Sequence, residues 1–155
     1  MQQITYKILL LSFFIFSGSQ TLFGQENNVE QELIKLTKKY NEAWKSLNVD
    51  SVSRYHAEDI IYYWLGSKGP TSKTEFEKLL KQILPTMKEY RHEILDIQVQ
   101  VLSDKVAIVS HTYDGEIIGN DGKAGNYDGA LTYVFHKRDG EWKIVLIHES
   151  ARNSK

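Results

Sequence analysis

Hydrophobic and polar residues follow their clearest pattern near the end of the chain, between Leu131 and Ser150. Two runs rich in β-branched and aromatic residues flank Arg138-Asp139-Gly140, which is typical of a hairpin because Asp tolerates the turn and Gly reaches positive φ. We expect Lys137 to pair with Glu141, with a bulge at Gly140. Alternation then predicts two faces: Leu131, Tyr133, Phe135, Val145, Ile147 and Glu149 on one, and Thr132, Val134, His136, Trp142, Ile144, Leu146 and His148 on the other.

Both faces of this hairpin are largely apolar, so we expect helices to cover one and a second subunit to cover the other. Apolar residues at three- and four-residue steps predict a long helix over 30–47, and Asp50 or Ser51 can cap a short second helix that runs through Tyr55. Ser72 begins a third helix, because Glu75 completes a capping box. Pro85 ends or kinks that helix.

The remaining segments are rich in β-branched and aromatic residues and are expected to form strands. Turn residues fill 66–70, and a longer polar loop fills 119–126. Helices gathered on one face of a curved antiparallel sheet make an α+β domain. The expected strands cover residues 56–65, 91–102, 105–118, 127–137 and 142–151.

The N-terminal residues have the pattern of a signal peptide. Lys7 precedes a short apolar run, and small and polar residues follow to Gly24. The run is too short for a membrane span, which needs about 20 apolar residues, and the chain has no Cys for a disulfide or a lipid. We expect a signal peptide over 1–24, a single domain over 25–155, and export, most simply to a bacterial periplasm.

Charge and aromatic content narrow the expected partners. Without residues 1–24 the chain keeps 18 Lys and Arg against 20 Asp and Glu, which favours neither nucleic acid nor an anionic membrane. Eight Tyr and three Trp against two Phe suit surfaces that are apolar on one side and form hydrogen bonds on the other. We find no His or Cys spacing typical of a metal site and expect neither a metal nor another cofactor.

Three segments carry a resemblance to a known superfamily. They are Trp44-Lys45-Ser46-Leu47-Asn48-Val49-Asp50, Tyr55-His56-Ala57-Glu58-Asp59-Ile60, and the hairpin from His136 to Val145. With the order of elements, they resemble the nuclear-transport-factor-2-like superfamily, and most of all its SnoaL-like and ketosteroid-isomerase-like exported bacterial proteins. The hairpin also resembles the association domain of calcium/calmodulin-dependent kinase. The resemblance spans Val29 to Arg152 and implies a cone-shaped curved sheet around a pocket, closed by N-terminal helices, in a homodimer formed through the outer sheet face.

The resemblance also implies which residues face the pocket. The isomerases use a Tyr on the first helix, where Tyr40 stands here, and a base carboxylate at the end of the first strand. Trp64 occupies about that second position, and an indole N–H cannot accept a proton, so the isomerase mechanism does not carry over. Glu149 and Tyr133 match pocket positions on the last two strands.

Glu149 and His111 are the candidate acid/base residues. A carboxyl group among aromatic rings holds a proton more readily than one in water and can act as a general acid or base. Glu149 can equally lie solvated at the rim or pair with Arg152 or Arg91, and His111 can be a core histidine. Shifting the hairpin by one residue would set Tyr133 beside His148 instead.

Three functions stay open. The first is binding of a small apolar or aromatic molecule. The second is a cofactor-free isomerase, dehydratase or hydrolase that uses Glu149 or His111, and the third is a non-catalytic assembly module. The expected ligand-binding residues are Tyr40, Trp44, Tyr62, Trp64, Tyr113 and Tyr133.

Overall fold

The computed structural model describes residues 28–64 and 66–154. The signal peptide predicted over 1–24 lies outside the described residues. The described part begins with a long helix over 28–45, called the first helix below. The other elements are α2 (Val49–Ser53), β1 (His56–Trp64), β2 (Ser67–Lys68), α3 (Lys73–Ile83), the short 3-10 helix η1 (Leu84–Thr86), β3 (Met87–Val101), β4 (Val106–Gly119), β5 (Ala124–Arg138) and β6 (Glu141–Asn153).

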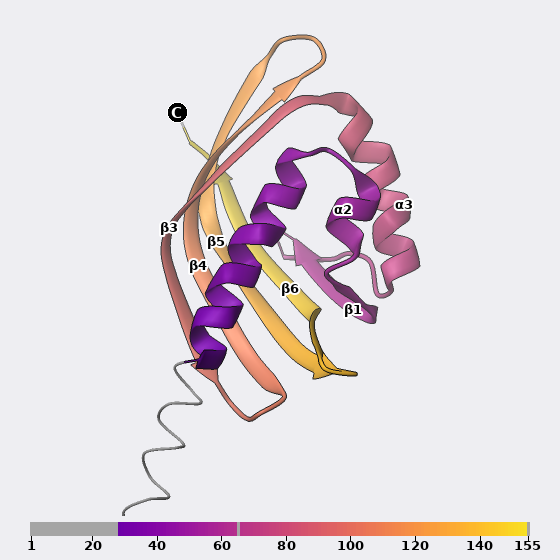
Figure 1. Ribbon diagram of the computed structural model, residues 1–155. Coiled ribbons are helices and arrows are strands. Elements are labelled where there is room, and N and C mark those ends of the chain that lie inside the picture. Colours follow the sequence, from indigo (N-terminus) through magenta and orange to yellow (C-terminus); the bar gives the residue numbers. More distant parts are fainter. Residues whose placement is uncertain (1–27, 65, 155) are drawn as a thin grey trace, which may run out of the picture.

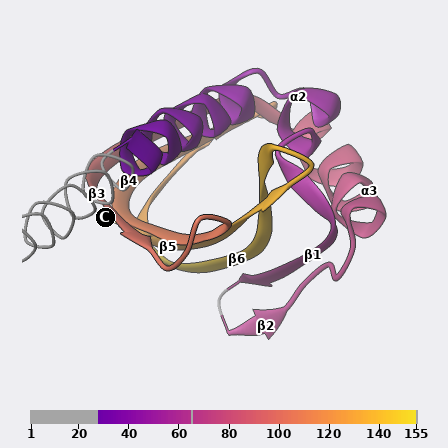
Figure 2. The same ribbon diagram turned by 60° about the horizontal axis from the view of Figure 1, so that its bottom comes forward.

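One curved sheet, three α-helices and the short η1 make up the described part of the chain. The strands follow the order β2-β1-β6-β5-β4-β3, and the sheet does not close on itself. Its long strands curl around the first helix, which crosses the concave side, while α2 and α3 lie beyond it over β1 (Figures 1 and 2). The predicted α+β class, with a cone-shaped sheet and N-terminal helices against it, is confirmed.

The sheet is mixed, whereas a wholly antiparallel sheet was expected. Strand β1 runs parallel to β6, and the other pairings are antiparallel. Parallel neighbours need a long connection, and here α3 and strands β3 to β5 separate the two strands in the chain. This pairing sets Trp64 in register with Glu149.

The two hairpin turns are tighter than predicted. Arg138 pairs with Glu141, so the β5–β6 turn has two central residues, and a Lys137–Glu141 pairing with a bulge at Gly140 is wrong. Asp139 and Gly140 both have positive φ, of 51° and 84°. That combination defines a type I′ turn, whose twist matches that of the strands. The loop predicted over 119–126 is likewise shorter, because β4 extends to Gly119 and β5 begins at Ala124.

The bulge of this hairpin lies inside β6. Val134 pairs with Leu146 and Phe135 with Ile144, which leaves Val145 as the extra residue. Trp142 and Ile144, which were expected on the same face as Val134 and Leu146, therefore turn inward and are buried. Beyond the bulge the predicted faces are correct: Tyr133 pairs with Ile147, and Leu131 with Glu149.

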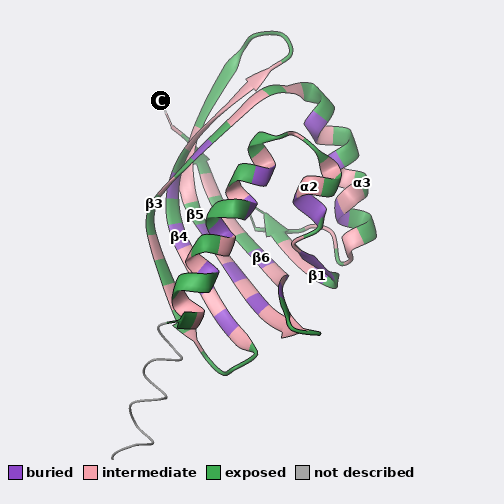
Figure 3. Ribbon diagram, viewed as in Figure 1, coloured by how far each residue is buried: buried purple, intermediate pink, exposed green. Residues whose placement is uncertain are grey.

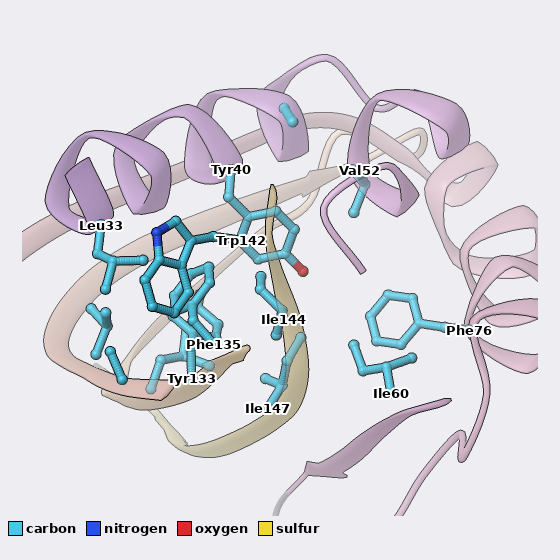
Figure 4. Packing of buried hydrophobic residues seen from close by; sticks show 14 of the residues in the cluster. Leu33, Tyr40, Val52, Ile60, Phe76, Tyr133, Phe135, Trp142, Ile144 and Ile147 are labelled. Atoms are coloured by element: carbon cyan, nitrogen blue, oxygen red, sulfur yellow. The ribbon is translucent and has the colours of Figure 1, made fainter. Parts of the chain in front are cut away.

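The core lies between the concave face of the sheet and the helices. Buried residues recur at every second position along the middle strands (Figure 3). In Figure 4, Leu33 and Tyr40 reach from the first helix toward Trp142, Phe135 and Tyr133 of the sheet. The core opens into a cavity near the end of β6 and the beginning of β5, and Glu149 lines this cavity.

Helix α3 begins as its sequence predicts. The backbone N–H of Glu75 donates to Ser72 Oγ at 3.2 Å, and the Glu75 carboxylate accepts from the N–H of Thr71 at 2.8 Å. The cap fixes the start of the helix, which turns Phe76, Leu79 and Ile83 toward the cavity. This helix therefore supplies one aliphatic wall of the candidate site.

Candidate functional site

A cavity of about 600 Å³ opens between the first helix, α3 and the concave face of the sheet. Aromatic and aliphatic side chains form most of its wall, and two charged residues line it, Glu149 and Arg152. Eight aromatic rings contribute: Tyr40, Trp44, Tyr62, Trp64, Phe76, Tyr90, Tyr127 and Tyr133. The cavity is large enough for a small organic molecule.

The Glu149 carboxylate lies on the floor of this cavity between two tyrosine hydroxyls. Tyr62 on β1 donates to Oε2 at 2.6 Å, and Tyr113 on β4 donates to Oε1 at 2.7 Å. Glu149 is half-buried and forms no ion pair with any residue in 28–64 or 66–154. Neither expected structural partner holds it, since Arg152 bonds to Asp128 and Arg91 to Glu89 and Glu116.

Both tyrosines stay protonated donors. Burial raises the pKa of Tyr62 and of Tyr113, and the negative charge of Glu149 raises both further. An ionised phenolate beside the carboxylate would place two negative charges within hydrogen-bonding distance. The three groups therefore act as one unit in which the carboxylate accepts a hydrogen bond from each of the two hydroxyls.

Tyr113 reaches Glu149 because a glycine lies opposite it. Tyr113 pairs with Gly129 across β4 and β5, and a Cβ at Gly129 would collide with the Ser150 carbonyl and crowd the Tyr113 hydroxyl. The next inward pair reverses the arrangement, with Gly115 opposite Tyr127 and the Tyr127 ring over the glycine. The two glycines make room for two rings on the concave face.

Tyr40 makes its hydrogen bond away from Glu149. Its hydroxyl lies 2.8 Å from Nε2 of His56, and both side chains are buried. Burial, and secondarily the charge of Lys73, lowers the pKa of His56 to about 3. The Tyr40 ring also packs edge-on against Tyr133, with centroids 5.6 Å apart. Tyr40 thus lines the cavity with its ring while a neutral histidine holds its hydroxyl.

His111, the second candidate acid/base residue, does not line the cavity. Its ring lies among those of His92, Tyr113 and Tyr133, at centroid distances of 5.6, 6.1 and 5.6 Å. It is buried, neither ring nitrogen has a hydrogen-bond partner among residues 28–64 and 66–154, and burial lowers its pKa. Its surroundings are those of a neutral core histidine behind the cavity wall.

The other predicted site residues fall into two groups. Tyr40, Trp44, Tyr62, Trp64 and Tyr133 line the cavity, with Trp64 exposed at its mouth. Tyr113 is not a lining residue but touches the site through its hydroxyl on Glu149.

Sequence reasoning missed Tyr90, His92 and Tyr127. The Tyr90 hydroxyl lies 3.1 Å from Nδ1 of His92, and all three side chains line the cavity. Alternation could have found Tyr127, because it lies an even number of residues from Tyr133 on the same strand. No comparable signal exists for Tyr90 and His92, since β3 has register shifts on both sides of them.

The arrangement supports hydrogen bonding, charge recognition and proton transfer at one carboxylate. Within the described ranges, no cluster of three or more His, Asp or Glu side chains could hold a metal ion. The helices among those residues include none with the length and apolar character to cross a membrane. Glu149 is the carboxylate that lines the cavity and accepts both tyrosine hydrogen bonds.

Comparisons with known proteins add the family context. Residues 29–153 match the family model of the calcium/calmodulin dependent protein kinase II association domain. The calcium/calmodulin-dependent protein kinase type II alpha chain of Drosophila melanogaster is 27% identical over 127 residues, which are 78% of this chain and 23% of that kinase. The chain thus spans about a quarter of the curated relative.

Solved structures share the fold at low identity. A Xanthomonas campestris protein assigned as an association domain of this kinase has a TM-score of 0.69 at 24% identity, covering 78% of this chain and 86% of its own. A Novosphingobium aromaticivorans protein assigned as a scytalone dehydratase has a TM-score of 0.75 at 17% identity, covering 83% of this chain and 90% of its own. The predicted nuclear-transport-factor-2-like fold is confirmed, and the range of these neighbours leaves the function open.

Proposed function

Since this chain belongs to the calcium/calmodulin dependent protein kinase II association domain family, we propose that it is a self-associating domain whose cavity binds a small apolar or aromatic molecule. The observation that carries the proposal is the Glu149 carboxylate, held by two tyrosine hydroxyls on the floor of an otherwise apolar cavity of about 600 Å³. The family does not specify a ligand, so we infer the ligand class from the geometry of the cavity.

Two physical features support binding. Ligand sites are typically apolar cavities of about 300–1,000 Å³ with a few fixed polar groups that orient the ligand. Here the aromatic wall supplies the apolar contact, and Glu149 and its two tyrosines supply the orienting groups. The aromatic side chains leave the cavity open, whereas a pure assembly module has no need for an open one.

A thermal-shift screen tests this proposal. The panel comprises steroid-like, aromatic and polyketide-like compounds, and a ligand at 100 times its Kd should stabilise the protein by about 2.7 kcal/mol. Ala151 lines the cavity, so Ala151→Phe should fill the space and abolish the shift. Its exposed neighbour gives a matched control, because Ser150→Phe adds the same ring outside the cavity.

Two results would count against binding in the cavity. A hit that Ala151→Phe and Ser150→Phe affect equally would place the ligand elsewhere on the protein. No stabilisation by any compound class would leave self-association as the function. The Ala151→Phe protein must first show a cooperative unfolding transition, so that loss of binding is not loss of fold.

Self-association is supported by the outer face of the sheet as well as by the family. Ile61, Leu146, Val134 and Ile108 are neighbours in register across β1, β6, β5 and β4, and all four are half-buried. They alternate with inward-facing core residues, so they form an apolar row on the outer face. We propose that a second copy of the chain covers this row, and that the chain is exported before it assembles.

A further inference from the structure

Glu149 brings a negative charge into the cavity that no neighbouring cation balances. The described residues offer it two neutral donors, the hydroxyls of Tyr62 and Tyr113, and no ion pair. Hydrogen bonds to a carboxylate spread its charge but do not cancel it. A ligand that reaches the floor of the cavity therefore meets a fixed negative charge in surroundings less polar than water.

The basic residues of the cavity wall do not offset the negative charge of Glu149. Burial, with smaller contributions from the charges of His111 and Lys45, lowers the pKa of His92 to about 3, so His92 is neutral at pH 7. Arg152 is exposed, and its Nε donates to Asp128 Oδ2 at 2.7 Å. The Arg152 charge is thus held outward and paired, away from the floor.

The aromatic wall adds attraction for positive charge. The faces of Tyr and Trp rings carry partial negative charge and attract ammonium groups, most strongly where water is excluded. Trp44 and Tyr90 pack with ring centroids 5.6 Å apart, and Trp64 stands at the mouth. A positive head group would pass these rings on its way to the carboxylate.

The cavity offers an anionic ligand no comparable favourable contacts. Tyr62 and Tyr113 already donate their hydroxyl protons to Glu149, and the Tyr40 hydroxyl is engaged with His56. An anionic ligand would face a like charge without a free cation to offset it. Neutral ligands would keep the apolar contacts but lose the ionic one.

From this combination we infer that the cavity selects a small organic cation, an amine or quaternary ammonium with an apolar or aromatic tail, with Glu149 as its counter-ion. The inference rests on the proposed function, because it names the ligand class of the same cavity. The inference predicts that ligands of the same shape bind with different affinities according to the charge of their head group. A matched set of probes can measure this difference.

The probes are 4-phenylbutylamine, 4-phenyl-1-butanol and 4-phenylbutyrate, which share a skeleton and differ in the charge of the head group. Calorimetric titration at pH 7 should give about tenfold tighter binding for the amine than for the alcohol, with the butyrate weakest. Glu149→Gln should remove the preference for the amine and change the affinity for the alcohol by less than about twofold. The exposed Glu93, which does not line the cavity, is the matched control, because Glu93→Gln also removes one negative charge.

A second pair of variants tests the aromatic contribution without touching the buried floor. Trp64 is 51% exposed, so its replacement should not endanger the fold. Trp64→Phe should keep the affinity for the amine, whereas Trp64→Leu should weaken it about threefold and leave the alcohol unchanged. If Glu149→Gln does not fold, the comparison of the three probes on the unaltered protein still tests selection by charge.

Equal or tighter binding of the alcohol or the butyrate would overturn the selection for cations and leave the proposed cavity function standing. Failure of all three probes to bind would also overturn it. The proposed function falls only if the wider compound panel gives no stabilisation either, so the two failures can be told apart.

Discussion

At the scale of single residues, the buried histidines make the stability of the fold depend on pH. His56, His92 and His111 are all buried, and burial lowers the pKa of each. The pKa values of His56 and His92 fall to about 3, whereas an unfolded chain has histidines with a pKa of about 6.5. Between these values the unfolded chain binds protons that the native protein does not.

Stability should therefore decrease as pH falls below about 6.5, by about 1.4 kcal/mol per pH unit for each such histidine. Above that pH the histidines cause no such loss of stability, because they are neutral in both the folded and the unfolded state. Urea unfolding followed by Trp fluorescence between about pH 7 and pH 5 isolates this effect, since most carboxylates titrate lower.

Replacing one buried histidine tests this cause. His92→Gln should flatten the slope of unfolding free energy against pH, because glutamine has no group that titrates in this window. A wild-type slope near zero in this window would show that the buried histidines do not titrate as their burial requires.

At the scale of elements, the β4–β5 ladder builds the floor of the cavity. Two strands of ordinary residues would crowd the concave face, but Gly129 and Gly115 each lie under the ring opposite them. Such cross-strand pairs stabilise a sheet and here also direct the Tyr113 hydroxyl to Glu149. Packing and ligand recognition therefore depend on the same glycine.

Gly129→Ala should lower the unfolding free energy by about 1–3 kcal/mol, because the added methyl group has no space between the backbone of β6 and Tyr113. It should also weaken binding of any ligand that contacts Glu149. Thermal or urea unfolding measures the first effect and calorimetry the second.

Gly125→Ala is the control on the same strand, since nothing lies within 4 Å of a Cβ at Gly125. It should leave stability unchanged or slightly improved, because Ala restricts the unfolded chain more than Gly does. Equal destabilisation by both substitutions would mean that the loss reflects glycine content and not the space under Tyr113.

At the scale of the whole molecule, the outer sheet face is the surface on which assembly should depend. The row of Ile61, Leu146, Val134 and Ile108 is continuous over four strands, and Leu146 lies at its centre. Leu146→Glu would bury a charge in the proposed contact, and should raise the dissociation constant of the oligomer more than about tenfold. Sedimentation velocity at several protein concentrations measures it.

Gln82 on α3 provides the control. It is exposed on a helix that packs on the concave side of the sheet, so Gln82→Glu adds the same charge away from the outer row. A monomeric wild type, or an oligomer that withstands Leu146→Glu, would place assembly elsewhere. Ligand binding by a monomeric Leu146→Glu protein would show that the cavity works within one subunit.

Local patterns anticipated much of this fold. Apolar spacing located the first helix, the Ser72 capping box started α3, and alternation along β5 and β6 put Tyr133 and Glu149 on one face. These features depend on neighbours a few residues away, so a single segment contains the information for them. Alternation past the turn still put these residues on the correct face because the tighter turn and the Val145 bulge each shift the pairing by one residue in the same direction, and a total shift of two residues leaves every side chain on its face.

Local sequence patterns were enough to predict the α+β class, the main helices and strands in their order, and the aromatic character of the cavity. Contacts between distant segments set the pairing of β1 with β6, the inward turn of Trp142, and the meeting of Tyr62 and Tyr113 on Glu149. Residues 62, 113 and 149 come from three strands far apart in the chain. Their meeting depends on strand order, a bulge and a glycine opposite a tyrosine, which are settled by packing between segments and not by the residues within any one of them.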